Sequence, residues 1–170
     1  LVGSEMCIRD SPDGDFYGFE QDLPAEELKI LHKVRDWTHN KVRPIATDYW
    51  NRCEFPHELL PSIQELDIIS LVRRQGRSHL LAGLVTAEIH RADASVGTFF
   101  SGQDGLFTGS IELLASEEQK ERWLPDIYAV KKTGVFAITE PDAGSDVAQD
   151  MSTTATKVDG GWILNGAKRW

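Results

Sequence analysis

The feature that most constrains the fold is a change of hydrophobic period near residue 132. Before it, apolar residues recur at three- and four-residue steps, the spacing that gathers them on one face of an α-helix. After it, a short apolar run over 135–138 and a threonine-rich stretch over 151–158 are typical of strands. The chain is therefore predicted to be mostly α, with a helical segment followed by the start of an antiparallel β-region.

The helical segment is expected to hold several helices. The first begins after Pro24 and should be kinked or split at Pro44. Its apolar stripe consists of Leu31, Val34, Thr38, Val42, Ile45 and Tyr49. Further helices are predicted over 55–66 and around 81–89, and the capping box that begins at Ser116 predicts another that runs to Tyr128.

Residues 94–115 are rich in small and apolar types, including Gly97, Gly102 and Gly105. Small residues let another element approach the backbone closely. That element is either a packed helix or a ligand, and the composition leaves both open.

We expect three parts along the chain. Residues 1–15 are expected to be a non-native or disordered extension, because residues 1–11 have no period and Pro12 to Gly14 break any element. A flexible native terminus is the alternative. Residues 16–131 are expected to form a helical domain, and residues 132–170 the beginning of a truncated β-domain.

Composition excludes several function classes. The chain has 18 Lys and Arg against 27 Asp and Glu, a formal charge of -9, which disfavours nucleic acid as a partner. No apolar run approaches the roughly 20 residues that a membrane span requires. The five histidines lack metal-ligand spacing, so no metal site is expected. Cys7 and Cys53 predict no disulfide framework, and Cys53 is expected to be a packed thiol.

Residues 136–146 are the most informative stretch, because a short strand enters a loop there. Pro141 fixes one turn dihedral, and Gly144 permits a close approach or a positive-φ backbone. Such a loop can direct successive N–H groups toward an anion, while Thr139 and Ser145 add hydroxyls. A flat heteroaromatic ring beside the strand and a phosphate at the loop would both be served. An ordinary β-turn satisfies the same spacing.

The octapeptide Thr139–Asp146 resembles the signature of the acyl-CoA dehydrogenase family of flavoproteins. The similarity covers about residues 20–170: residues 116–125 resemble the helix before the signature, residues 162–170 the hairpin after it, and residues 87–95 the central helices. Other short stretches, such as Asp48–Trp50, resemble the branch that joins glutaryl-CoA dehydrogenase to plant short-chain acyl-CoA oxidases.

The resemblance implies an N-terminal helical domain, a middle β-domain and a C-terminal helical bundle, of which this chain would hold the first and the opening of the second. It also implies that FAD is the cofactor. Gly144 and Ser145 would lie at the flavin pyrophosphate, and Trp170 would open a segment that packs near the flavin. The residues placed along the isoalloxazine ring are Phe136, Ala137, Ile138 and Thr139, with Thr139 bonding its polar edge.

The activity that the resemblance implies is α,β-dehydrogenation of an acyl-CoA thioester to the trans-2-enoyl-CoA. The family's catalytic base lies in the C-terminal bundle, so we expect no catalytic residue in these 170 residues, and an inactive, weakly FAD-binding chain in isolation. Glu140 is expected to be structural. Ser145 would touch the substrate, while Gly97, followed by Thr98, matches the arginine that pairs with a distal carboxylate in glutaryl-CoA dehydrogenases. A neutral acyl chain is therefore expected.

The electron acceptor stays open at this point. An electron-transferring flavoprotein as acceptor would make the protein a dehydrogenase, and oxygen would make it an oxidase. The alternative to both enzymes is a non-catalytic helical interaction module.

The full-length protein is expected to be a homo-oligomer, a tetramer in the family, located in a bacterial cytoplasm or in a eukaryotic mitochondrial matrix or peroxisome. Residues 67–79 are shorter and more basic than the family's glycine-rich loop at this place.

Overall fold

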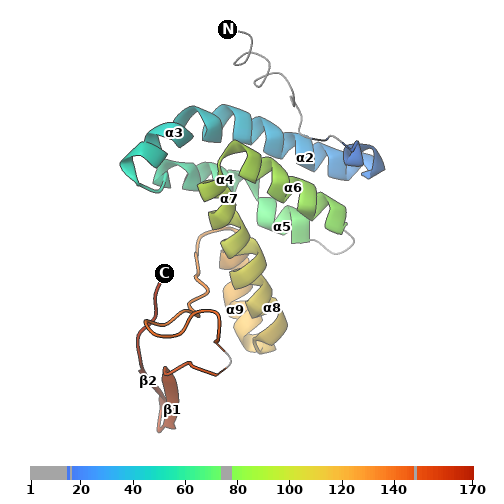
Figure 1. Cartoon of the computed structure of the whole chain (residues 1–170). Coiled ribbons are helices and arrows are strands. Elements are labelled where there is room, and N and C mark those ends of the chain that lie inside the picture. The colour runs from blue at the N-terminus through green and yellow to red at the C-terminus, as the bar shows by residue number, and fades with distance from the viewer. Residues whose placement is uncertain (1–14, 16, 74–77, 148) are drawn as a thin grey trace. The chain divides into compact units, whose positions relative to one another are not determined.

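The computed structural model describes residues 15, 17–73, 78–147 and 149–170. The chain divides into two compact units, one up to Gly134 and the other Val135–Trp170. The first is helical, and the second holds a two-stranded antiparallel sheet (Figure 1). The predicted fold class is thus confirmed. The expected extension lies outside the described residues except for Asp15, whose carboxylate accepts hydrogen bonds from the backbone N–H groups of Phe19 and Glu20.

The elements follow one another along the chain with short connections. The helical unit consists of η1 (Phe19–Asp22), α2 (Ala25–Trp37), η2 (Thr38–Val42), α3 (Arg43–Arg52), η3 (His57–Leu59), α4 (Leu60–Leu66), α5 (Ile68–Arg73), α6 (His79–Ala92), α7 (Ala94–Ser101), η4 (Gly102–Thr108), α8 (Gly109–Leu114) and α9 (Glu117–Tyr128). The second unit contains β1 (Thr154–Val158) and β2 (Gly161–Asn165).

Pro44 does not split the first long helix. The π-helical turn η2 joins α2 to α3, so the helix continues from Ala25 to Arg52 (Figure 1). A proline lacks the N–H that an α-helix needs, and its ring crowds the carbonyl four residues earlier. The wider turn just before Pro44 changes this pairing locally and keeps the helix running. The predicted break is therefore absent, and a π-helical turn lies just before Pro44 instead.

The core of the helical unit lies where α6 packs against α2 and α7. Of the predicted stripe on the first helix, Leu31, Val34, Thr38 and Val42 are buried, which confirms that face as the packed one. The other buried apolar side chains include Ile63, Leu66, Ile68, Ile69, Leu81, Val85, Ile89, Val96 and Phe100. Each fully buried aliphatic side chain contributes about 1.5–3 kcal/mol to this core.

The segment taken as a shortened loop is partly helical. Asp67 adopts a left-handed conformation with φ 51°, which ends α4, and α5 begins at the next residue. Ile68, Ile69 and Val72 of α5 are buried in the core. Because these apolar residues gain more by packing than by facing water, the segment folds back as a helix. Residues 74–77 of the expected loop lie outside the described residues.

Cys53 is exposed, so the expectation of a packed thiol is wrong. It follows the last turn of α3 with φ 55°, and the backbone N–H groups of Cys53 and Glu54 bond the carbonyls of Trp50 and Tyr49. This is the position just after a helix, where the chain turns away from the helix axis. Its place at the cap, rather than its apolar character, sets the exposure of the side chain.

Strands form where they have a neighbour. The predicted hairpin is present: β1 pairs antiparallel with β2 from Thr154 opposite Asn165 to Val158 opposite Gly161, and Gly160 in the turn has φ 83°. The predicted strand over 135–138 is absent. Since a β-strand is defined by its ladder and no strand among the described residues pairs with this run, it stays irregular, with an Ile138 N–H to Phe136 carbonyl bond of 3.2 Å.

Gly97 allows α7 to pass close to α6, and we predict that Gly97→Ala destabilises the chain. A Cβ built at Gly97 would lie 2.5 Å from Cγ of His90, whose ring is also held by a 2.9 Å contact between Nδ1 and the Thr86 carbonyl. The ring cannot move aside cheaply, so the free energy of unfolding in urea should fall by about 1–3 kcal/mol.

The matched control is Gly83→Ala, on an exposed face of α6 where an added Cβ meets nothing within 4 Å. That change should raise the free energy of unfolding by about 0.5–1 kcal/mol, because alanine costs less backbone entropy in a helix. Equal effects of the two substitutions would show that the α6–α7 contact does not require glycine.

Candidate cofactor site

The octapeptide singled out in the sequence contains a tight turn. The backbone N–H of Glu140 donates to the carbonyl of Ala143 at 2.8 Å, and the N–H of Ala143 donates back at 3.4 Å. Pro141 takes the second position of this turn, where its fixed φ is favourable. Ala143 is buried while Pro141 and Asp142 are exposed, so the turn is anchored at its base and its tip faces solvent.

The side chain of Glu140 anchors the turn. The residue is 3% exposed, and its carboxylate accepts hydrogen bonds from Ser152 N (2.6 Å), Ser152 Oγ (2.7 Å), Thr153 N (3.0 Å) and Lys168 Nζ (2.8 Å). The bond from Lys168, together with those from Thr153 and Ser152, holds the pKa of Glu140 well below its usual range. A carboxylate that is satisfied in this way is a poor proton acceptor. The structural role expected for Glu140 is therefore what its geometry provides.

The segment after β2 runs beside the residues that lead into the turn. The N–H of Arg169 donates to the Thr139 carbonyl at 2.8 Å, and Lys168 Nζ donates to the Ile138 carbonyl at 3.1 Å. The backbone of Ile138 and Thr139 is thus held by two consecutive residues from a segment about 30 positions later.

The residues predicted to face a ring system keep accessible groups. Phe136 is 51% exposed, Ala137 is exposed, and Ile138 and Thr139 are half-buried. Within the part of the chain that the structure describes, Thr139 is hydrogen-bonded through its carbonyl, which accepts from the N–H of Arg169, while its hydroxyl has no hydrogen-bond partner. A hydroxyl in this state is available to donate to or accept from a ligand.

Gly144 and Ser145 continue from the turn as exposed backbone. Gly144 does not have the positive φ that the sequence suggested, because the turn before it closes with Ala143 in the fourth position. A Cβ at Gly144 would meet nothing within 4 Å. The described residues of this chain therefore do not require a glycine here, whereas close approach of a ligand to the backbone would.

The other residues predicted to bind the cofactor or the substrate lie in different parts of the structure. Trp170 follows Arg169 and is 96% exposed. Gly97 and Thr98 lie on α7 in the helical unit, where Gly97 is buried and the hydroxyl of Thr98 donates to the Ala94 carbonyl at 2.8 Å. The structure thus brings Thr139 and the Trp170 segment together within one unit. At Gly97 it supplies a packing reason for the small residue.

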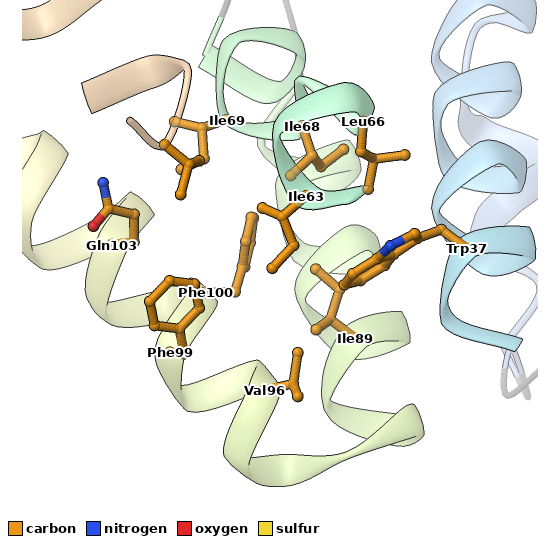
Figure 2. Close-up of a pocket in the computed structure, with 11 residues that line it drawn as sticks. Trp37, Ile63, Leu66, Ile68, Ile69, Ile89, Val96, Phe99, Phe100 and Gln103 are labelled. Carbon is orange, nitrogen blue, oxygen red and sulfur yellow. The ribbon is translucent and has the colours of Figure 1, made fainter. Parts of the chain in front are cut away.

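The cavity in the core of the helical unit is too small for a substrate. Figure 2 shows its apolar lining, with Trp37 and Gln103 at opposite ends. Its volume is about 10 Å³, the space of about one water molecule. This cavity belongs to the packing of the helices.

Sequence analysis missed two residues that shape the site region. Lys168 lies within residues 162–170, which resemble the family's hairpin, but the sequence predicted no role for it. Gln103 is buried, donates to the Lys132 carbonyl at 2.9 Å and accepts from the N–H of Gly134 at 3.1 Å, so it fixes the chain just before the second unit begins. A lone glutamine in a run of small and apolar residues was the available signal, since a buried amide needs partners.

The geometry provides one hydroxyl for a polar contact and a stretch of backbone that a ligand can approach closely. The free Thr139 hydroxyl offers a polar contact, and the open Gly144–Ser145 backbone offers close approach. Among the described residues, no group of three or more metal-ligating side chains is present. In the same residues, no helix combines the length and apolarity needed to cross a membrane.

Comparison with known families matches both units. The profile of the acyl-CoA dehydrogenase N-terminal domain matches residues 24–131, and that of the acyl-CoA dehydrogenase middle domain matches residues 135–170. The chain is 31% identical over 154 residues to the mouse short-chain specific acyl-CoA dehydrogenase, a mitochondrial protein; the match covers 88% of this chain and 37% of the relative.

Solved structures give the same result. A glutaryl-CoA dehydrogenase from Mycobacterium smegmatis superposes with a TM-score of 0.81 at 34% identity, over 90% of this chain and 41% of that one. A glutaryl-CoA dehydrogenase structure from the same organism in complex with FADH2 has a TM-score of 0.81 at 31% identity, over 91% and 41%. The chain therefore spans about two fifths of the length of these relatives.

The ionised state of Glu140 leads to a pH-dependent prediction. Its pKa is lower in the folded protein than in the unfolded one, so its contribution to stability is complete above the unfolded pKa of about 4.3 and is lost as the pH falls below it. Glu140→Gln should therefore destabilise the chain at pH 7, and the gap from wild type should shrink by pH 3.5 in urea denaturation.

The control for this experiment is Asp142→Asn, which removes an exposed carboxylate from the same turn. It should leave the difference from wild type nearly constant with pH. A gap for Glu140→Gln that stays the same at both pH values would contradict the assigned ionisation.

Proposed function

The chain belongs to the acyl-CoA dehydrogenase family, and on this premise we propose that the full-length protein is an FAD-dependent enzyme that converts an acyl-CoA thioester to its trans-2-enoyl-CoA. The observation that carries the proposal is the Thr139 hydroxyl, which has no hydrogen-bond partner among the described residues and lies in the same unit as the exposed backbone at Gly144 and Ser145. The match of residues 135–170 to the middle domain favours this enzyme over a helical module without chemistry.

The residues present fit FAD. A glycine whose Cβ would meet open space leaves room for a diphosphate against the backbone, and the exposed Ser145 adds a hydroxyl beside it. The exposed Phe136 and Ala137 offer an apolar surface for a flat ring. The structural relative in complex with FADH2 supports the same assignment. We place Ile138, Thr139 and Trp170 in the same flavin site.

The tasks of the chain are to bind and orient. FAD, when bound, supplies the acceptor for the hydride that leaves the substrate β-carbon. The Thr139 hydroxyl bonds the polar edge of the ring system, and Gly144 and Ser145 hold the diphosphate. Ser145 also contacts the acyl-CoA. Donors aimed at the thioester carbonyl would stabilise the negative charge that develops on its oxygen.

The catalytic base is not Glu140. Its carboxylate is buried and already accepts four hydrogen bonds, so it lacks both access and proton affinity. We place the base outside these 170 residues, and therefore propose that the chain alone is inactive and binds FAD weakly. We propose that the helical domain covers residues 16–131 and that the β-domain begins at residue 132. The division of the chain into two compact units after Gly134 supports a boundary in this region.

The substrate is proposed to be a neutral acyl-CoA. We place Gly97 at the position of the carboxylate-pairing arginine of the glutaryl-CoA branch, and the hydroxyl of the next residue, Thr98, is already bonded to the Ala94 carbonyl. A distal carboxylate at this place would lose its hydration without gaining a cation. The similarity to a short-chain specific enzyme supports a short chain.

We also propose an assembly, a location and an electron acceptor for the enzyme. We propose a homo-oligomer as the full-length assembly. The mouse relative is a mitochondrial protein, which supports the mitochondrial matrix as the location if the source is eukaryotic; a bacterial source would place the enzyme in the cytoplasm. The acceptor is proposed to be an electron-transferring flavoprotein, with oxygen as the alternative.

Gly144 gives a direct test of cofactor binding. Gly144→Val should leave the free energy of unfolding of the apoprotein nearly unchanged, since the space around its Cβ is open. In the full-length protein it should weaken FAD binding by about tenfold or more, equivalent to about 1.4 kcal/mol, because the side chain blocks close approach of the diphosphate. Calorimetric titration of both apoproteins with FAD measures the difference, and equal affinities would contradict the assignment.

Reduction by substrate tests the reaction and the acceptor. Anaerobic addition of butyryl-CoA to the full-length protein should bleach the flavin absorption band. Re-oxidation by air should be slow for a dehydrogenase, whereas rapid formation of hydrogen peroxide would identify an oxidase. No bleaching by butyryl-CoA or by longer acyl-CoA thioesters would reject the proposed activity.

A further inference from the structure

The side chain of Lys168 contacts separate segments of the second unit, and the comparisons assign it no role. Its Nζ lies 2.8 Å from Glu140 Oε1, 3.1 Å from the Ile138 carbonyl and 3.6 Å from Met151 Sδ. The side chain of Lys168 is 28% exposed, and that of Glu140 is 2% exposed. A partly buried ammonium with a charged partner and a carbonyl partner is held far more firmly than a surface lysine.

Glu140 extends this junction to a third segment. Its second carboxylate oxygen accepts from both the N–H and the hydroxyl of Ser152, and its first accepts from the N–H of Thr153, just before β1. The ion pair therefore ties together the run that contains Thr139, the base of the hairpin, and the segment after β2. We call this ion pair, Lys168 with Glu140, the clip.

The backbone that the clip holds is the one that presents Thr139. Ile138 is bonded through its carbonyl to Lys168, and Glu140 is held by the carboxylate contacts, so both neighbours of Thr139 are fixed. The Thr139 carbonyl is bonded to the N–H of Arg169 at 2.8 Å. This backbone is irregular and forms no strand ladder, so side-chain contacts must supply the rigidity that a sheet would otherwise give.

We propose that Lys168 is a positioning residue of the flavin site: through its ion pair with Glu140 and its bond to the Ile138 carbonyl, it sets the direction of the free Thr139 hydroxyl. This rests on the proposed function, since it takes FAD to be the ligand of Thr139. Lys168 itself touches no reacting atom in this proposal. It acts on the ligand only through Thr139, in the way that outer contacts orient groups that bind directly.

The test uses the full-length apoprotein reconstituted with FAD and compares wild type with Lys168→Gln. The variant removes the charge and leaves an amide donor on a side chain that is one bond shorter. We expect its FAD dissociation constant to rise by up to about tenfold, the effect of losing the one hydrogen bond between the displaced Thr139 hydroxyl and the ring. We also expect the reduction potential of the flavin that does bind to shift, because its polar edge meets a displaced hydroxyl.

The potential separates positioning from general support. A clip that only stabilises the unit would lower the melting temperature and the bound fraction, yet leave the potential of the bound flavin unchanged. Lys157→Gln is the matched control, because Lys157 is an exposed lysine on β1 of the same unit. It should change neither the affinity nor the potential.

Two further variants keep the proposal falsifiable if Lys168→Gln fails to fold. Lys168→Arg retains the charge but spreads its donors over a planar group, so it should fold and show a smaller shift of potential. Glu140→Gln and Lys168→Arg combined should give a shift that differs from the sum of the single shifts, because both changes act on one contact.

The outcomes distinguish the two levels of inference. Failure of the wild-type protein to bind FAD would overturn the proposed function and this inference with it. Tight FAD binding by wild type, with the same affinity and potential in Lys168→Gln and Lys168→Arg, would overturn the positioning role alone.

Discussion

The second unit of this protein depends on one buried carboxylate. Glu140 sits at the base of a turn and accepts hydrogen bonds from Ser152, Thr153 and Lys168, which come from two separate places in the sequence. Every residue of β1 and β2 is exposed, so burial of apolar side chains within the hairpin contributes little. The hydrogen-bonded carboxylate of Glu140 therefore stabilises this unit, whereas a hydrophobic core stabilises the helical unit.

The helical unit is stabilised instead by the packing of its helices. Two π-helical turns, η2 and η4, let long helices continue past Pro44 and through the glycine-rich run. In the second of these turns the Thr108 hydroxyl donates to the Gln103 carbonyl at 2.6 Å, which satisfies a backbone group that regular α-helical pairing would have used. Gln103 in turn holds the chain at Gly134, so the irregular turn fixes where the helical unit ends.

Function in this family has to be assembled from parts that single segments lack. The signature residues supply an accessible hydroxyl and an open backbone, yet the carboxylate among them is fully occupied by structural contacts. We therefore propose a proton acceptor outside these 170 residues, and a chain that spans about two fifths of its relatives is proposed to bind and orient but not to react.

The sequence by itself determined the element types wherever the signal was local. Hydrophobic period predicted the helices, Ser116 and Gln119 predicted a helix start that the structure confirms, and Asp159–Gly161 predicted the hairpin turn. Only the tertiary structure decided the outcome where distant partners mattered. Residues 135–138 have strand composition but pair with no other strand of the described residues, Gly97 is explained by the His90 ring, and Lys168 meets Glu140 across 28 positions. Period and capping act within a few residues, whereas ladders, close packing and buried ion pairs require segments that the chain brings together only on folding.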